Sequence, residues 1–196
     1  MALAPPKPAT FDDAAALGDD VYVEVLAGEI VPKAAPSAEH ADAQAALGFA
    51  LGSAFHRRGG GGAPGGWWLL PECDVELAVH DVVRLGGVAQ VAGRRAPHRA
   101  ARSHRPGLDL RDPLGIERAH RPEGEARALH QHRVRPYWIV DPERETLTVH
   151  RWAEGGYLVT MVATRGDVVR AEPFEAIELR VGLLFGDDLD DASTGS

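Results

Sequence analysis

Cysteine, lysine and long apolar runs are scarce in this chain, and each scarcity excludes a class of protein. The single cysteine, Cys73, excludes an internal disulfide and suits the reducing cytoplasm. No apolar run approaches the roughly 20 residues of a membrane-spanning helix, and the first residues lack the apolar core of a signal peptide. Lys7 and Lys33 are the only lysines among 21 basic residues, which indicates a gene of high G+C content. We therefore expect a cytoplasmic protein without a membrane segment.

The chain is long enough for one globular domain. It has 196 residues, of which 44% are hydrophobic, so a sizeable core can be buried. We expect a single domain over residues 1–186, followed by an acidic tail over residues 187–196. The net charge of −8 argues against indiscriminate binding of polyanions.

Residues 84–135 differ from the rest of the chain in composition, charge and apolar periodicity. They hold 12 of the 21 basic residues, all arginine, and 5 of the 29 acidic ones, so their formal charge is +7 while the remainder carries −15. Glycine, proline and histidine interrupt them often, and apolar periodicity is almost absent. This composition predicts an irregular segment, much of it disordered.

Hydrophobic patterns predict strands on either side of this middle segment and one long helix before it. Thr10 is expected to cap a short helix that ends near residue 17, and Ser37 a helix that ends near residue 57. The core face of the long helix is expected to contain these residues: Ala41, Ala45, Leu47, Phe49, Leu51, Gly52 and Phe55.

Strands are predicted at residues 21–26, 29–31, 67–70, 73–79, 137–140, 146–152 and 157–163. Another strand begins at Val82 and is expected to stop at Arg84. Shorter strands near Val168 and Ile177 are expected to complete the sheet.

Two flanking stretches carry a recognisable pattern. Tyr22-Val-Glu-Val-Leu-Ala-Gly-Glu-Ile-Val, followed by Pro36-Ser-Ala-Glu-His, resembles the opening of the Uma-two family of restriction endonucleases. Tyr137-Trp-Ile-Val-Asp-Pro-Glu, Gly155-Gly-Tyr and Leu183-Leu-Phe are similar to the C-terminal half of the same family. These matches span about three quarters of the chain.

The resemblance implies a restriction-endonuclease-like α/β fold of the PD-(D/E)XK superfamily, with a mixed sheet flanked by helices. In that superfamily an aspartate and a glutamate on adjacent strands bind Mg²⁺, which prefers hard oxygen ligands. The metal acidifies a water and neutralises charge on the phosphodiester, and a lysine positions the nucleophile. The implied substrate is therefore DNA, the implied cofactor is Mg²⁺, and a homodimer is left open.

The motifs that should carry this chemistry are missing. Asp81-Val-Val-Arg leads up to the first one, but Leu85-Gly86 stands where the family has Pro-Asp, and the glutamate motif is absent. The metal ligands in this reading are therefore unknown, and we expect an impaired endonuclease. The alternative is a catalytically inactive remnant that binds nucleic acid through its basic middle.

A shift of reading frame explains the loss. With permissible codons, residues 106–114 read one base later give P-D-W-I-C-E-I-L-S, and residues 115–129 give A-S-N-A-P-T-D-L-K-V-K-R-E-L-Y. These strings are the family's glutamate motif and the lysine-bearing helix after it. The same offset turns residues 88–91 into W-R-R-W. We therefore hypothesise a compensated frameshift that leaves the frame near residues 84–85 and returns near residues 130–135.

Two residues outside the shifted segment are candidates for an auxiliary catalytic role by resemblance. Glu29 could lie near the metal, or be a solvated strand glutamate, and His40 could reach the site, or be a surface histidine at a helix start. Asp74, Glu76 and Asp81 are more typical of solvent-facing and turn positions than of a site.

Other chemistry is less favoured by the pattern. A lone cysteine such as Cys73 is more often core filling than a nucleophile. Metal binding is disfavoured for the five histidines of the middle because they lack paired ligand spacing: His98, His104, His120, His130 and His132. An unrelated interaction domain with a flexible basic insert is a further reading of the same composition.

Overall fold

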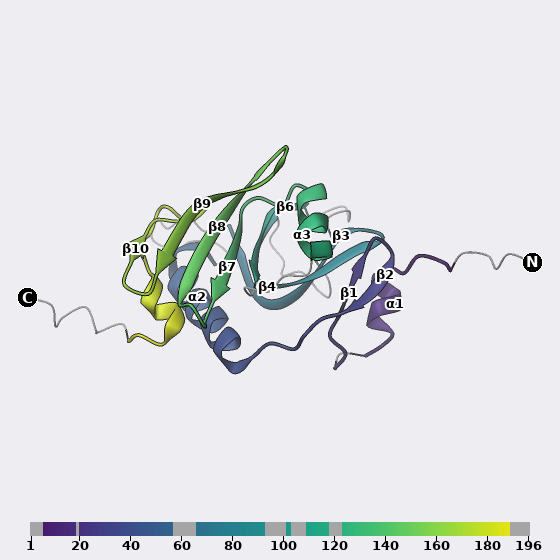
Figure 1. Cartoon of the computed structure of the whole chain (residues 1–196), viewed down its shortest axis with the longest axis horizontal. Coiled ribbons are helices and arrows are strands. Elements are labelled where there is room, and N and C mark those ends of the chain that lie inside the picture. Colours follow the sequence, from purple (N-terminus) through teal and green to yellow (C-terminus); the bar gives the residue numbers. More distant parts are fainter. Residues whose placement is uncertain are drawn as a thin grey trace, which may run out of the picture.

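A mixed sheet with helices packed on it forms the body of the protein (Figure 1). The computed structural model describes residues 6–18, 20–56, 66–92, 101–102, 109–117 and 123–188, and of these, residues 86–92, 101–102 and 109–117 by their backbone alone. In the described part of the chain the main sheet has nine strands. Seven follow the order β2-β1-β4-β6-β7-β8-β9; the other two lie beside this path, where β3 pairs with β4 and β5 pairs with β3. The predicted mixed α/β class is therefore confirmed.

The bounds of the elements are as follows. The helices are α1 (Phe11–Ala15), α2 (Ala38–Phe55), α3 (Glu123–Gln131) and a 3-10 helix (Val181–Phe185). The strands of the first half are β1 (Val23–Leu26), β2 (Glu29–Pro32), β3 (Trp68–Ala78), β4 (Asp81–Ala92), β5 (Ala101–Arg102) and β6 (Asp109–Glu117). Those of the second half are β7 (Tyr137–Asp141), β8 (Thr146–Ala153), β9 (Gly156–Thr164), β10 (Val168–Val169) and β11 (Leu179–Arg180).

Strand β4 joins the two halves of the sheet. β3 runs antiparallel along one side of it, from Ala78↔Asp81 to Trp68↔Ala89. On its other side β1 pairs at its start, through Val25↔Val82, and β6 pairs near its end, through Val88↔Leu114. β6 then runs parallel to β7, which opens the antiparallel hairpins β7-β8-β9. The strand predicted to stop at Arg84 therefore continues to Ala92, and that prediction was wrong.

Helix α2 covers the larger core. Ser37 caps it by accepting a hydrogen bond from the His40 backbone N–H, as predicted. Its buried residues Leu47, Leu51 and Phe55 pack with Trp138, but Phe49 is 69% exposed. Ala41 and Ala45 are exposed as well, and Ala43 is buried instead. The predicted stripe was therefore half wrong: alanine fits either face of a helix, and the buried face runs through Ala43, Leu47, Leu51 and Phe55, which leaves Phe49 outside it.

A second core lies under α3. This helix belongs to residues 84–135, the segment predicted to be irregular. Val75 and Leu77 of β3, Val83 and Leu85 of β4, and Leu129 of α3 are buried together there. The predicted helix at Thr10 is confirmed as α1, with its capping box. The strand predicted near Ile177 lies at β11 and pairs with β10 in a separate two-stranded sheet, so it does not extend the main one.

Candidate active site

Strand β4 carries the position where the resemblance places the first metal ligand. That position is Gly86, and the backbone register identifies its neighbour. β3 pairs Leu70 with Gly87 and Cys73 with Leu85, and the register shifts between these two pairs. Pro71 and Glu72 form this bulge, so Glu72 is the acidic residue that β3 brings opposite Gly86.

The backbone of Glu72 is held in an unusual conformation. Its φ of 45° lies in the left-handed region, which costs a residue with a Cβ about 1–2 kcal/mol. Its Oε1 accepts a hydrogen bond of 2.8 Å from Gln44 Nε2 on α2. The same nitrogen lies 2.9 Å from His40 Nε2, and His40 is only 4% exposed.

The two residues predicted as auxiliary groups lie on different elements, His40 on α2 and Glu29 on β2. His40 is joined through Gln44 to Glu72, at the bulge of β3. Glu29 follows the turn at Gly28, whose backbone N–H donates to the carbonyl of His80, between β3 and β4. Glu29 is exposed, whereas His40 is buried.

Three charged side chains meet beneath α3 instead. Lys33 Nζ donates to Glu24 Oε1 at 2.8 Å and to Glu125 Oε1 at 3.3 Å, and its third partner is the carbonyl of Arg84. Glu24 is 3% exposed and Glu125 is 1% exposed. Glu24 Oε1 also accepts the Arg84 backbone N–H at 2.9 Å. We call Glu24, Lys33 and Glu125 the buried triad; it ties β1, β4 and α3 together.

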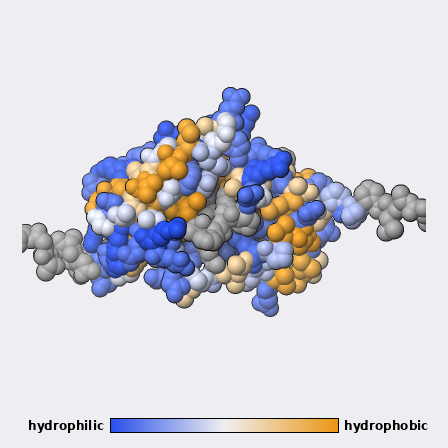
Figure 2. Space-filling model, viewed as in Figure 1, coloured by the Kyte–Doolittle hydropathy of each residue, from blue (hydrophilic) through white to orange (hydrophobic). Residues whose placement is uncertain are grey.

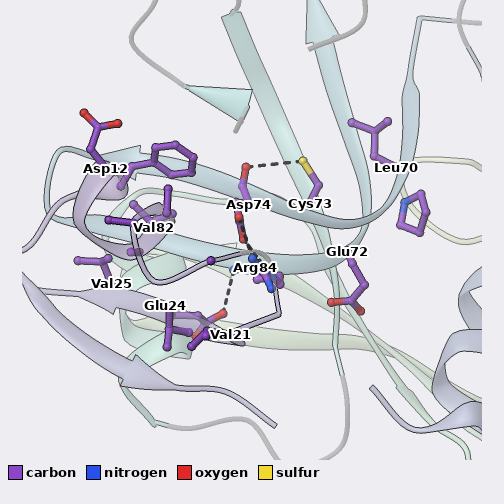
Figure 3. A pocket seen from close by; sticks show the side chains of 17 residues that line it. Asp12, Val21, Glu24, Val25, Leu70, Glu72, Cys73, Asp74, Val82 and Arg84 are labelled. Atoms are coloured by element: carbon purple, nitrogen blue, oxygen red, sulfur yellow. Dashed lines mark hydrogen bonds and ion pairs between the residues drawn. The ribbon is translucent and has the colours of Figure 1, made fainter. Parts of the chain in front are cut away.

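Glu24 of the buried triad lines a cavity of about 640 Å³ between α1, β1, β3 and β4 (Figure 3). Glu24, Glu72, Asp74 and Arg84 line it, together with Cys73. Arg84 donates to both carboxylate oxygens of Asp74, at 2.6 and 3.0 Å. That bidentate pair raises the pKa of Arg84 above its ordinary value. The positive charge of Arg84, next to the missing motif, is therefore balanced by the carboxylate of Asp74.

Burial raises the pKa of Glu24 above its ordinary value of 4.5, and the carboxylate of Glu125 raises it further. The ammonium of Lys33 and the backbone N–H of Arg84 act in the opposite direction. Desolvation and a like charge therefore outweigh the hydrogen bonds at this residue.

This shift predicts a pH dependence of stability. The folded state holds a proton on Glu24 at pH values where the unfolded chain has released it. The stabilising contribution is therefore present below about pH 4.5 and is lost as the pH rises through the raised pKa. We expect the free energy of unfolding of the native chain, relative to Glu24→Gln, to fall from pH 4.5 to pH 8 in denaturant titrations. A difference that is constant over this range would contradict the assignment.

The remaining predicted residues have structural partners. Asp81 accepts the backbone N–H of Ala27 at 2.8 Å and lies 2.9 Å from His132 Nε2. His130 Nε2 lies 2.8 Å from the carbonyl of Ala153, and its ring stacks on Trp152. His98, His104 and His120 lie outside the described residues. Sequence reasoning missed Glu24, Lys33, Glu72 and Glu125, and Glu24 alone had a signal, because it lies within the Tyr22 motif.

The two positions where the resemblance places the Mg²⁺ ligands carry no carboxylate. Gly86 offers no ligand, and residue 111 of β6, where the shifted reading has glutamate, is an arginine. Among the described side chains, no group of three or more His, Cys, Asp or Glu is arranged to hold a metal ion. The scaffold of two adjacent strands, β4 and β6, is nevertheless formed.

Comparison with solved structures identifies a similar fold. The crystal structure of "a putative nuclease belonging to DUF820" from Anabaena variabilis ATCC 29413 is similar to this chain with a TM-score of 0.60. The match covers 91% of this chain and 98% of that protein, at 16% sequence identity. The similarity establishes the fold. No protein-family model and no curated protein matches the chain. In the described part of the chain, no helix is both long and apolar enough to cross a membrane.

Proposed function

We propose that this chain has the scaffold of a Mg²⁺-dependent DNA endonuclease of the PD-(D/E)XK superfamily, Uma-two family, and that its present reading lacks the metal ligands. The observation that carries the proposal is the fold, which over 91% of the chain is similar to that of a protein described as "a putative nuclease". The Tyr22 and Tyr137 motifs support the family. Auxiliary roles for His40 and Glu29 belong to the same proposal, with His40 the better placed of the two.

The positions of β4, β6 and α3 support the shifted reading. That reading has a glutamate at residue 111, which lies on β6, and β6 pairs with β4, which carries position 86. The register pairs Leu110 with Val91 and Leu114 with Val88, so positions 86 and 111 lie on neighbouring strands but not opposite each other. Carboxylates on adjacent strands are what the metal chemistry needs. Its lysine-bearing helix falls on α3. In its present reading the chain has glycine at position 86 and arginine at position 111, so the proposal assigns it no metal-dependent step.

The first test is a cleavage assay on the purified chain. Supercoiled plasmid is incubated with the protein in Mg²⁺ and, as the control, in EDTA. We expect no difference in nicking, because Gly86 and Arg111 cannot bind the metal. Robust Mg²⁺-dependent nicking would contradict the proposed loss of the active site.

The second candidate function is nucleic-acid binding without cleavage. Residues 84–135 carry a formal charge of +7, which favours phosphate contacts. Arg84 is already paired with Asp74, so it adds little to such a surface. Salt-dependent binding of plasmid DNA in the same EDTA samples would support this function, and binding that is absent at low salt would remove it.

A further inference from the structure

Trp152 is a half-buried indole near the end of β8 that α3 holds in one orientation. Its Nε1 donates to the carbonyl of His130 at 2.8 Å. The His130 ring stacks on the indole with centroids 5.5 Å apart, and its Nε2 lies 2.8 Å from the carbonyl of Ala153. The end of α3 and the β8-β9 hairpin are therefore joined at this ring.

Two arginines of the segment between α3 and β7 lie over the same ring. The guanidinium carbon of Arg135 is 4.5 Å from the centroid of Trp152, and that of Arg133 is 5.6 Å from it. Both distances are within the roughly 6 Å of a cation–π contact. Both arginines are exposed. Stacking restrains a guanidinium without using its N–H donors, so these donors remain available to a partner.

The end of α3 also fixes the backbone of Arg133. The Val134 N–H donates to the carbonyl of Leu129 at 3.0 Å, and the Arg133 N–H donates to that of His130 at 3.1 Å, as in a Schellman motif. In this motif Arg133 has a φ of 55°, a conformation that glycine ordinarily adopts. Val134 is fully buried in the core under α3. The arginines on either side of it are thereby anchored at the surface.

The two arginines make no ion pair with a carboxylate of the described residues. Four other exposed arginines do have such partners: Arg144, Arg151, Arg165 and Arg170. Two like charges over one ring repel each other, and an anion that contacts both removes this repulsion. We call Arg133, Arg135 and Trp152 the arginine patch. It is a cationic surface on a chain whose net charge is −8.

We propose that the arginine patch binds the phosphate backbone of DNA. A guanidinium presents its N–H donors as a planar fork that matches two oxygens of one phosphate, and it keeps its charge at any physiological pH. Because the indole already contacts His130 and both guanidinium groups, phosphates are contacted there and no base is stacked. Contacts of this kind position DNA without reading its sequence.

This inference rests on the proposed nucleic-acid binding and names the residues that carry it. Arg84 is paired with Asp74, whereas the arginine patch is open to a partner. β7 begins at Tyr137, opposite Gly115 of the parallel strand β6. Both arginines and residue 111 precede this pair along their chains. A bound backbone would therefore lie at the end of the sheet where the shifted reading has its glutamate.

Two double variants with the same net charge test the patch. Arg133→Gln/Arg135→Gln removes two charges from it, and the control Arg144→Gln/Arg170→Gln removes two from exposed arginines that already face carboxylates. Filter binding of a short DNA duplex is measured in EDTA at about 50–200 mM salt. We expect the patch variant to bind about tenfold more weakly, with a salt slope smaller by about 2, one for each lost phosphate contact.

The control variant should bind DNA like the native chain, and circular dichroism verifies that both variants fold. Equal losses of affinity for the two variants would overturn the patch, because net charge alone would then explain the binding. A native chain that binds poly-glutamate as tightly as DNA at the same salt would identify a surface for acidic proteins and would also overturn it.

Chemical modification gives a readout that needs no substitution. Phenylglyoxal modifies exposed arginines, and mass spectrometry locates the products. Saturating DNA should protect Arg133 and Arg135 and leave Arg144, which is 75% exposed beside Asp141, as reactive as before. Equal reactivity of Arg133 and Arg135 with and without DNA would contradict the proposal.

Failure of this inference differs from failure of the proposed function. If the native chain binds DNA and the patch variant binds it equally well, only the patch is overturned, and the contacts lie elsewhere in the chain. If the native chain binds no DNA at low salt, nucleic-acid binding falls together with the patch. The nuclease scaffold is tested separately, by cleavage.

Discussion

Restoring the shifted reading between residues 85 and 130 is expected to convert a chain that does not cleave DNA into a Mg²⁺-dependent endonuclease. The restored chain would place carboxylates on β4 and β6, which are neighbours in the sheet. A bound metal supplies several kcal/mol of transition-state stabilisation, and each 1.36 kcal/mol is a tenfold change in rate. We expect plasmid nicking to increase by about 10³-fold or more over the present chain.

The control for this experiment keeps the restored chain and replaces the new carboxylate at position 111 by an amide. It should fold like the restored chain and lose most of the nicking, because an amide does not compensate the metal charge. The gene should also be resequenced across the codons for residues 80–138. If one base is missing near Leu85 and a compensating change lies near His132, the restored protein is the natural one. A restored chain that folds, as circular dichroism reports, and still leaves plasmid intact would refute the nuclease assignment.

Trp138→Ala is expected to give the largest loss of stability of any single substitution in the described core. Trp138 is fully buried, its ring lies edge-on to Phe174 at 5.7 Å, and its Nε1 donates to the carbonyl of Glu172 at 2.8 Å. Deleting a buried aromatic ring costs about 3–5 kcal/mol, because contacts are lost and a cavity remains. The free energy of unfolding from denaturant titration measures this loss.

Two further substitutions calibrate the result. Trp138→Phe keeps a ring against Phe174 but leaves the Glu172 carbonyl without its donor, so we expect a smaller loss of about 1–3 kcal/mol. Leu158→Ala removes a side chain that is 58% exposed on β9 and should change stability by about 0.5 kcal/mol or less. Figure 2 shows hydrophobic atoms over this strand at the surface. Equal losses for Trp138→Ala and Leu158→Ala would contradict the described core.

The regular hairpins could be predicted because their strands are rich in apolar residues and their turns carry suitable residues. Tyr137-Trp-Ile-Val is an apolar run that is buried on both faces of the sheet: Trp138 belongs to the core under α2, and Tyr137 stacks on His150 with ring centroids 4.4 Å apart. Asp141 accepts the backbone N–H groups of Glu143 and Arg144, which explains the turn after the strand.

The continuation of β4 and the strand β6 could not be predicted from such patterns. Their residues include Gly86, Gly87 and Pro113, which strand propensities disfavour. What places them in the sheet is backbone pairing with β3 and with each other. Backbone hydrogen bonds do not depend on side-chain periodicity, so a segment without apolar periodicity can still occupy strands of the sheet.

The buried triad was missed for a different reason. Glu24 lies in a short strand between valines, where a glutamate ordinarily faces solvent. It is buried because α3, distant in the sequence, covers it, and periodicity within β1 carries no information about that contact. Glu72 was missed because it contacts α2 from a bulge in β3. That bulge arises from the pairing of β3 with β4, which the pattern of residues within β3 does not reveal.

The placement of the four tryptophans determines what a fluorescence measurement would observe. Trp67 and Trp138 belong to the core under α2, Trp68 lies edge-on to His56 at the end of that helix, and no tryptophan belongs to the core under α3. Trp152 alone reaches α3, through its Nε1 bond to the carbonyl of His130. Three of the four indoles would thus keep their emission if α3 came away from β3 and β4. Intrinsic fluorescence therefore reports mainly on the core under α2. Subtracting the emission of the Trp152→Phe variant from that of the native chain would isolate the signal from α3.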